Sequence, residues 1–110
     1  MSGPRLTAEF WVQAYLARLR IHDIPAFLTA KGDPTSGAVI VKLSTLDGHA
    51  RAFHRSYDAE FNRVWVELAS GDDRDVEDML AGQRATDPDL WIVEVEDRAG
   101  RHLLDEEGLG

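Results

Sequence analysis

The chain contains no cysteine among its 110 residues. Disulfide bonds and thiolate metal sites are therefore excluded, and so are enzymes that use a thiol nucleophile. No apolar run approaches the length that crosses a bilayer, and the first residues lack the basic stretch and apolar core of a secretory signal. We therefore expect a soluble, cytoplasmic protein with no membrane contact.

Positive charge is also scarce, because the chain has 12 basic residues against 20 acidic ones, and its formal net charge is −8. Proteins that bind duplex nucleic acid carry a basic face, since neutralising phosphates supplies most of their affinity. The basic residues here are scattered along the chain. We predict that nucleic acid is not a partner.

Several catalytic and binding motifs are missing as well. There is no Gly-x-Ser-x-Gly elbow, and the four histidines show no His-x-x-x-His spacing. The segment from Gly32 to Gly37 superficially suggests a phosphate-binding loop, but it lacks the Gly-Lys-Ser/Thr ending and leads into a strand instead of a helix. We therefore expect no metal and no cofactor.

What is present fits one domain over residues 1–110, without internal repeats. Hairpin-linked strands and two helices indicate the α+β class, with two helices packed on a mostly antiparallel sheet in the order α-β-β-β-β-α-β-β. The expected elements, in chain order, are a helix of about fifteen residues after an N-cap at Thr7, strands at 26–30, 38–46, 49–55 and 63–68, a helix between Ser70 or Asp72 and Asp87, and strands at 90–96 and 101–104.

Asp47 and Gly48 form the strongest hairpin signal in the chain. A two-residue turn there pairs Leu43 with Ala52 and Lys42 with Phe53. Side chains alternate between the two faces of a sheet. This register therefore places Phe53 with Ile40, on the face opposite the aliphatic residues 39, 41 and 43.

The residues from 87 to 105 hold the densest run of β-forming residues, and the rest of the chain is expected to be organised around it. Asp97 to Gly100 suits a turn that joins the last two strands. In that hairpin, Glu96 lies opposite His102. Alternation puts Trp91, Val93, Val95 and Leu103 on the core face, and Leu90, Ile92, Glu94, Glu96, His102 and Leu104 on the other.

Glu94, Glu96 and His102 are the best catalytic candidates on this second face. Two carboxylates two residues apart on a strand are separated by roughly 7 Å, a distance that would allow them to flank a small ligand. An imidazole opposite Glu96 suits general acid–base chemistry. The alternative is a solvated face with a cross-strand ion pair.

The second face also collects large apolar residues, which monomers rarely leave in water. We predict that a second copy of the chain or another protein covers them, with Trp65 as the anchor. Two alternatives stay open: a helix covers this face, or a bulge reverses the face assignment in one strand. The expected interface residues are Ile40, Phe53, Trp65, Leu90 and Ile92, with Leu104 beside them.

Four stretches together resemble the DUF1491 family. The resemblance implies a small, single-domain alphaproteobacterial protein of unknown function, and it implies no activity, cofactor or site residue. The stretches are Arg5 to Val12, Gly37 to Leu43 with Leu46-Asp47-Gly48, Asp87 to Glu94, and Asp97 to His102.

Two functional hypotheses follow from the residues. The first is a non-enzymatic interaction module, most simply a homodimer that uses the second sheet face. The alternative is a small ligand-binding protein, hydrolase or isomerase that uses Glu94, Glu96 and His102.

Overall fold

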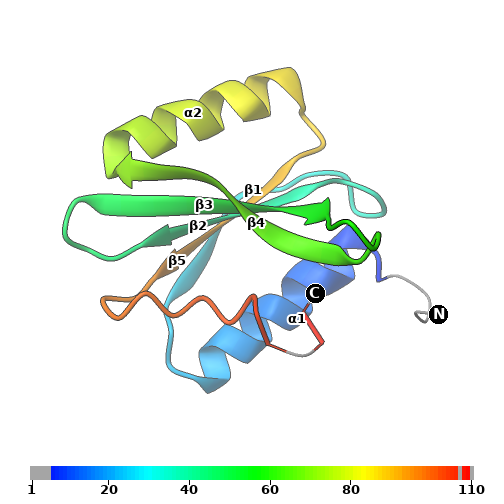
Figure 1. Cartoon of the computed structure of the whole chain (residues 1–110), viewed down its shortest axis with the longest axis horizontal. Coiled ribbons are helices and arrows are strands. Elements are labelled where there is room, and N and C mark those ends of the chain that lie inside the picture. The colour runs from blue at the N-terminus through cyan, green and yellow to red at the C-terminus, as the bar shows by residue number, and fades with distance from the viewer. Residues whose placement is uncertain (1–5, 107, 110) are drawn as a thin grey trace.

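The computed structural model describes residues 6–106, 108 and 109. A five-stranded sheet in the order β1-β5-β2-β3-β4 separates two helices, with α2 above it and α1 below it in Figure 1. The elements are α1 (Ala8–Ile21), β1 (Ala26–Ala30), β2 (Val39–Ser44), β3 (His49–Tyr57), β4 (Arg63–Asp72), α2 (Asp73–Thr86) and β5 (Trp91–Glu96).

The prediction of the first helix is confirmed. Thr7 is the N-cap, and its hydroxyl oxygen accepts a hydrogen bond from the Phe10 amide at 3.2 Å. Glu9 lies in the first turn and Arg18 and Arg20 in the last, where their charges suit the helix dipole. The helix ends at Ile21, ahead of Pro25, which continues a helix poorly.

The sheet confirms the α+β class but not the predicted order of strands. β5 lies between β1 and β2, antiparallel to the first and parallel to the second, so the sheet is mixed. The observed order is α-β-β-β-β-α-β, and the predicted last strand at 101–104 does not form. Both edges of β5 are already paired, which leaves no edge on which residues 101–104 could form a hairpin with it.

The turn itself does form. The Gly100 amide donates to the Asp97 carbonyl at 3.0 Å, and Gly100 has a φ of +78°. Asp97 also accepts hydrogen bonds from the Arg101 amide and guanidinium, which lower the pKa of this carboxyl group. After the turn, Leu103 has a φ of +61°, and the chain crosses below the sheet beside α1 (Figure 1).

The hairpin between β2 and β3 is present with a wider turn than predicted. Ser44 pairs with Ala50, and both Leu46 and Gly48 in the connecting loop have positive φ. The predicted register is therefore wrong by one residue, and Val41 pairs with Phe53. This shift moves Phe53 to the α1 side of the sheet, away from Ile40.

A bulge in β4 changes the faces of that strand. Ala52 pairs with Ala69 but Phe53 pairs with Glu67, so Leu68 is the extra residue. Leu68 and Ala69 both pack toward α2, whereas Trp65 packs against the α1 side. The prediction that Trp65 lies on the second face with Ile40 is therefore wrong.

Each helix covers one apolar face of the sheet. The α1 side contains the predicted core residues of β2 and β5 together with the segment after residue 101, and the α2 side is smaller. The α1 cluster includes Trp11, Val12, Tyr15, Leu19, Val39, Val41, Leu43, Phe53, Trp91, Val93, Val95, Leu103, Leu104 and Leu109. The α2 cluster is Ile40, Ala50, Ala52, Val76, Leu80, Leu90 and Ile92.

Two hydrogen bonds fasten the C-terminal segment to the α1 side. The Tyr15 hydroxyl donates to the His102 carbonyl at 2.7 Å, and the Trp65 indole donates to the Leu109 carbonyl at 2.9 Å. Tyr15 is fully buried, and burial raises the pKa of its hydroxyl group. The hydroxyl therefore stays protonated and remains a donor at neutral pH.

Replacing Tyr15 with phenylalanine is expected to lower the free energy of unfolding by about 1 to 2 kcal/mol, because the partly buried His102 carbonyl loses its donor. Denaturant titration measures the loss, and amide exchange of residues 102–104 should accelerate more than that of β2. Equal acceleration in both places would contradict a local role for this bond.

Within the described residues, neither helix is long and apolar enough to cross a membrane.

Candidate functional site

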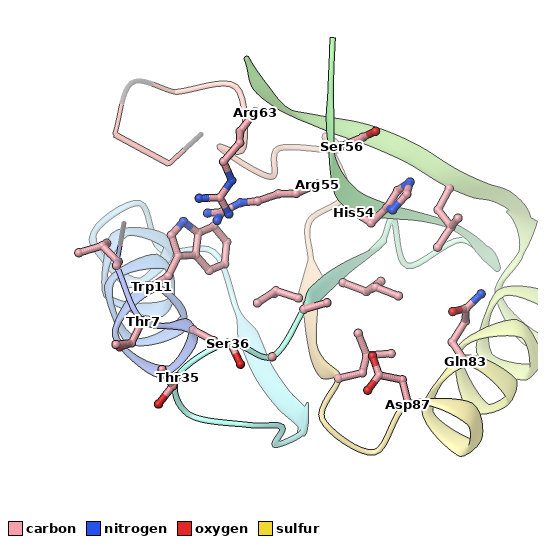
Figure 2. A pocket seen from close by; sticks show the side chains of 18 of the residues that line it. Thr7, Trp11, Thr35, Ser36, His54, Arg55, Ser56, Arg63, Gln83 and Asp87 are labelled. Atoms are coloured by element: carbon pink, nitrogen blue, oxygen red, sulfur yellow. The ribbon is translucent and has the colours of Figure 1, made fainter. Parts of the chain in front are cut away.

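A cavity of about 690 Å³ opens at the end of the sheet where β2 begins. Pairing between β2 and β3 stops at Ile40 and His54, whereas β3 and β4 stay paired as far as Tyr57 and Arg63. The sheet narrows there, and the N-terminus of α1, the loop at 35–38 and the end of α2 surround the resulting space (Figure 2).

One end of the cavity is cationic. Arg55 and Arg63 project toward Trp11 there, as Figure 2 shows. The Arg55 guanidinium carbon lies 4.6 Å from the Trp11 ring centroid and 5.0 Å from that of Trp65, so two aromatic faces hold it. Arg55 and Arg63 therefore bring two guanidinium groups to this end of the cavity, in a chain with a formal net charge of −8.

The opposite end is formed by α2. Gln83 and Asp87 lie there, across the cavity from the two arginines in Figure 2, with His54 on the side of β3. Apolar side chains of Val39, Ile40 and Leu90 lie among the lining residues. The cavity therefore combines an apolar body with polar groups at two separate ends, as small-molecule sites commonly do.

The N-terminus of α1 borders this cavity but is not an anion site. The Ala8 amide donates to the Thr35 carbonyl at 3.1 Å, and the Glu9 amide donates to the Pro34 carbonyl at 2.9 Å. The Phe10 amide is capped by Thr7. The first-turn donors that bind phosphate in other proteins are thus already used.

The glycine-containing loop at 32–37 is a packing element. One oxygen of Asp33 accepts hydrogen bonds from the Ser36 amide, the Thr35 amide and the Ser36 hydroxyl, and the Ser36 amide bond is the largest cause of the lowered pKa of Asp33. Added Cβ atoms at Gly32 and Gly37 would lie 2.0 and 2.2 Å from the Asp89 carbonyl oxygen. The loop therefore needs its glycines for close contact with the chain before β5.

The three catalytic candidates from the sequence are not brought together. Glu94 and Glu96 alternate with the core residues of β5 and project to the α2 side, where Glu94 lies 3.6 Å from Lys42. The His102 ring contacts Phe53 on the α1 side, with ring centroids 4.8 Å apart. The predicted pairing of Glu96 with His102 is wrong, because it depended on the hairpin that β1 and β2 displace.

His102 serves the packing of the C-terminal segment. Its Nδ1 accepts a hydrogen bond from the Leu104 amide at 3.0 Å, so this nitrogen carries no proton. Burial lowers the pKa of the imidazole below its ordinary value of 6.5, and the nearby Arg51 acts in the same direction. The folded protein thus favours the neutral ring.

Because the folded pKa of His102 is lowered, its contribution to stability is present above pH 6.5 and is lost as the pH falls below that value toward the folded pKa. The variant His102→Asn keeps an acceptor for the Leu104 amide and does not titrate. We expect thermal unfolding of the variant to depend less on pH between neutral and mildly acidic conditions than that of the wild type. Parallel pH profiles would contradict this role.

Lys42 is the centre of a second polar cluster, under α2. Its side chain is only 2% exposed, and its ammonium lies 2.6 Å from Glu77, 2.9 Å from Asp73 and 3.6 Å from Glu94. Burial alone would lower the pKa of this ammonium, but the hydrogen bonds to Asp73 and Glu77 and the charge of Glu94 outweigh it and raise the pKa. The cluster ties α2 to β2 and β5, and we assign it to stability.

No group of three or more histidine, aspartate or glutamate side chains is arranged to hold a metal ion in the part of the chain that the structure describes.

The predicted interface residues are distributed over both clusters. Ile40, Leu90 and Ile92 are buried beneath α2, and Phe53 and Trp65 pack on the α1 side. The prediction that they form one uncovered face is wrong, because α2 covers the second face and the register shift removes Phe53 from it.

Sequence reasoning missed the cavity and its arginines. One signal was present: the ten residues from Gly48 to Tyr57 include no acid, in a chain with 20 of them. Arg55 lies in this stretch. Trp11 and Asp87 also line the cavity, but each is more than 30 residues from Arg55 in the sequence. Only the fold brings them together.

Residues 6–105 match the sequence pattern of DUF1491, a protein of unknown function. The chain belongs to the DUF1491 family. The resemblance seen in the sequence is thereby confirmed. None of the proteins with curated descriptions matches this sequence.

Solved structures of DUF1491 proteins support the fold. A crystal structure of a family member from Caulobacter crescentus is 35% identical, with a TM-score of 0.84 over 93% of this chain and 97% of that one. An NMR structure of a family member from the same species is 34% identical, with a TM-score of 0.80 over 94% of this chain and 96% of that one. A protein from A. tumefaciens, 24% identical with a TM-score of 0.71 over 84% and 86% of the two chains, shares the fold.

Membership of DUF1491 brings no activity with it, and the cavity is the feature of this fold that is suited to a function.

Proposed function

We propose that this protein binds a small organic molecule in the cavity at the start of β2. The cavity itself carries the proposal, because its volume of about 690 Å³ falls in the range of small-molecule sites. Its lining supports the proposal, since Trp11, Val39 and Ile40 offer apolar contact beside the polar groups of Arg63 and Asp87.

Binding is favoured over the hydrolase or isomerase alternative. That alternative needs Glu94 and Glu96 to act together with His102, and the sheet separates them. General acid–base catalysis requires the groups to reach one substrate atom. The cavity instead has the anatomy of a site that recognises a ligand by shape and polarity.

A fluorescent apolar anion, anilinonaphthalene sulfonate, tests the proposal. We expect saturable binding to the native protein with a stoichiometry of one, because a cavity of about 690 Å³ accommodates one dye molecule. Ser56→Trp introduces a bulky ring into the lining of the cavity and should lower the affinity for the dye by about tenfold or more. Ser70→Trp, at the exposed far end of β4, is the matched control and should leave binding unchanged.

Amide-resolved NMR shows where the dye binds. Shifts confined to residues of the cavity support the proposal. Shifts spread over exposed apolar residues, together with equal affinity in both tryptophan variants, would overturn it.

Homodimer formation stays a prediction. The five residues expected to form the interface are buried or packed within one copy of the chain, so a dimer would have to use other residues. Light scattering at high concentration measures the mass directly. We expect Trp65→Ala to lower stability, because the indole packs on Trp11 with centroids 5.2 Å apart and donates to Leu109. Unchanged stability together with a loss of dimer mass would restore the original interface.

A further inference from the structure

We propose that the outer edge of β1 is an interface at which a second copy of this chain pairs, so that the two sheets join into one. This interface is separate from the cavity, because no residue of β1 lines the cavity. It also uses none of the five residues that the sequence suggested for a dimer.

The backbone of β1 is open on its outer side. Among the described residues, β1 lies at one edge of the sheet and pairs only with β5. The Glu96 amide donates to the Pro25 carbonyl at 2.9 Å, so the polar backbone groups of Pro25 face β5. Backbone groups alternate along an antiparallel ladder. Phe27 therefore faces β5 as well, whereas the amides and carbonyls of Ala26 and Leu28 point outward and can pair with another strand.

The two edges of the sheet differ in their protection against such pairing. Charged side chains and bulges keep edge strands from joining other strands. β4, at the other edge, carries Arg63, Glu67 and Asp72 and contains the bulge at Leu68. The irregularity in β1 follows Leu28, and residues 24–30 contain no charged side chain. Two copies with a formal net charge of −8 can therefore approach along β1 without placing like charges face to face.

Leu28 and the surface beside Ala26 are complementary in shape. Both residues lie on the α1 side of the sheet, because each is opposite a core residue of β5. The side chain of Leu28 is 42% exposed, and a hollow of about 390 Å³ next to Ala26 is lined by Leu16 and Ile24 among others. An interface between two identical copies must be complementary to itself. A protrusion and a hollow two residues apart on one strand meet this condition.

A twofold axis at Phe27 also satisfies the backbone. It pairs Ala26 with Leu28 of the second copy in an antiparallel register, so the outward amides and carbonyls of both copies bond to each other. Each Leu28 side chain then lies over the hollow of the other copy. Phe27 is opposite Glu94 on the α2 side, where its ring is 52% exposed, and it would face its own counterpart. Aromatic pairs across strands are favourable.

Sedimentation and amide exchange test this interface together. The contact is short, so we expect a weak dimer with a dissociation constant of about 10 to 500 µM. As the protein concentration rises through this range, exchange of the Ala26 and Leu28 amides should slow much more than that of the Phe27 amide, which faces β5.

Two results of these measurements would overturn the proposal. One is a chain that remains monomeric at about 1 mM, whether or not β1 then pairs with a strand of another protein. The other is a dimer in which exchange of the Ala26 and Leu28 amides does not slow, because its interface would lie elsewhere.

Phe27→Lys tests the register. The two lysines would face each other and weaken the dimer by about tenfold or more, whereas a lysine opposite Glu94 suits the monomer fold. Phe61→Lys is the matched control and should leave the dimer unchanged, since Phe61 is 84% exposed in the loop between β3 and β4. Phe27→Glu should also weaken the dimer. Mixing it with Phe27→Lys should restore the dimer, because opposite charges then face each other.

Leu28→Ser is the second variant if a charge at position 27 prevents folding, which circular dichroism detects. It shortens the protruding side chain and should weaken the dimer by about tenfold. A dimer that keeps its wild-type affinity in the folded variants of Phe27 and Leu28 would overturn this inference. Loss of dye binding would instead concern the proposed function alone, since the cavity lies apart from β1.

Discussion

Replacing Gly32 with alanine is expected to cost about 3 kcal/mol or more of unfolding free energy, or to prevent folding. The added Cβ would lie 2.0 Å from the Asp89 carbonyl oxygen and 2.7 Å from the Trp91 ring. Neither neighbour can move away freely, because the Asp33 amide donates to the same carbonyl at 3.0 Å and the Trp91 indole donates to the Asp33 carbonyl at 2.7 Å. Urea titration measures the loss.

The control for this substitution is another glycine in the same protein. Gly82 lies within α2 with nothing inside 4 Å of an added Cβ, so Gly82→Ala should raise stability by about 1 kcal/mol through helix propensity. If both variants changed stability in the same direction, the close contact at Gly32 would not be the cause.

Replacing Lys42 with methionine should have a similarly large effect. The variant keeps the apolar stem but removes the ammonium from Asp73, Glu77 and Glu94. Removing one partner of a buried ion pair typically costs about 3 to 5 kcal/mol, and we expect the lower end, since the side chains of Asp73 and Glu77 are partly exposed. Lys31→Met is the control, because Lys31 is exposed and lies 3.9 Å from Glu9, a pair worth less than about 1 kcal/mol.

The pH dependence gives this prediction a second measurement. The raised pKa of Lys42 means that its stabilisation is complete below pH 10.5 and is lost as the pH rises through the folded pKa. Burial raises the pKa of Glu94 above 4.5, and Lys42 opposes that rise. Without Lys42 the Glu94 pKa rises further, so the deficit of the variant should shrink as the pH falls toward 4.5. A deficit that grows on acidification would contradict this arrangement.

The sequence predicted those parts of the fold that local signals determine. The cap at Thr7 and the apolar stripe with Trp11 and Tyr15 define α1, and the alternation in Trp91–Glu96 defines β5. Gly100 marked its turn correctly. These features depend on residues close together in the chain, so spacing and residue type suffice to find them.

The errors in the predicted fold concern how strands that are far apart in the sequence pair with one another. β5 could pair with the residues after it or lie between β1 and β2, and the second arrangement joins segments more than 50 residues apart in the sequence. The alternation of apolar and polar residues along β5 is the same in both arrangements, so it does not distinguish them. Loop length decided the register of Phe53, and the extra residue at Leu68 decided the faces of β4. Each is a shift of one residue, and such a shift exchanges the two faces of a strand.

The candidate site was lost for the same reason. Glu94, Glu96 and His102 are neighbours in the sequence and would share a face only in a hairpin. The cavity is lined instead by residues from separate elements: Arg55 on β3, Trp11 on α1 and Asp87 at the end of α2. No motif or spacing in the sequence connects these three residues. A cavity formed where one strand starts later than its neighbours leaves little trace in a sequence.

The insertion of β5 also has a consequence for protein synthesis. β1 and β2 are synthesised early, but β5, which lies between them in the sheet, is synthesised after β3, β4 and α2. Ala26 therefore cannot pair with Val95 until β5 has been made. Contacts so distant in sequence close slowly, because ordering the long intervening segment costs entropy. The nascent chain therefore leaves one edge of β2 and the whole of β1 unpaired until β5 emerges. A nascent chain that ends before residue 91 lacks the strand that lies between β1 and β2.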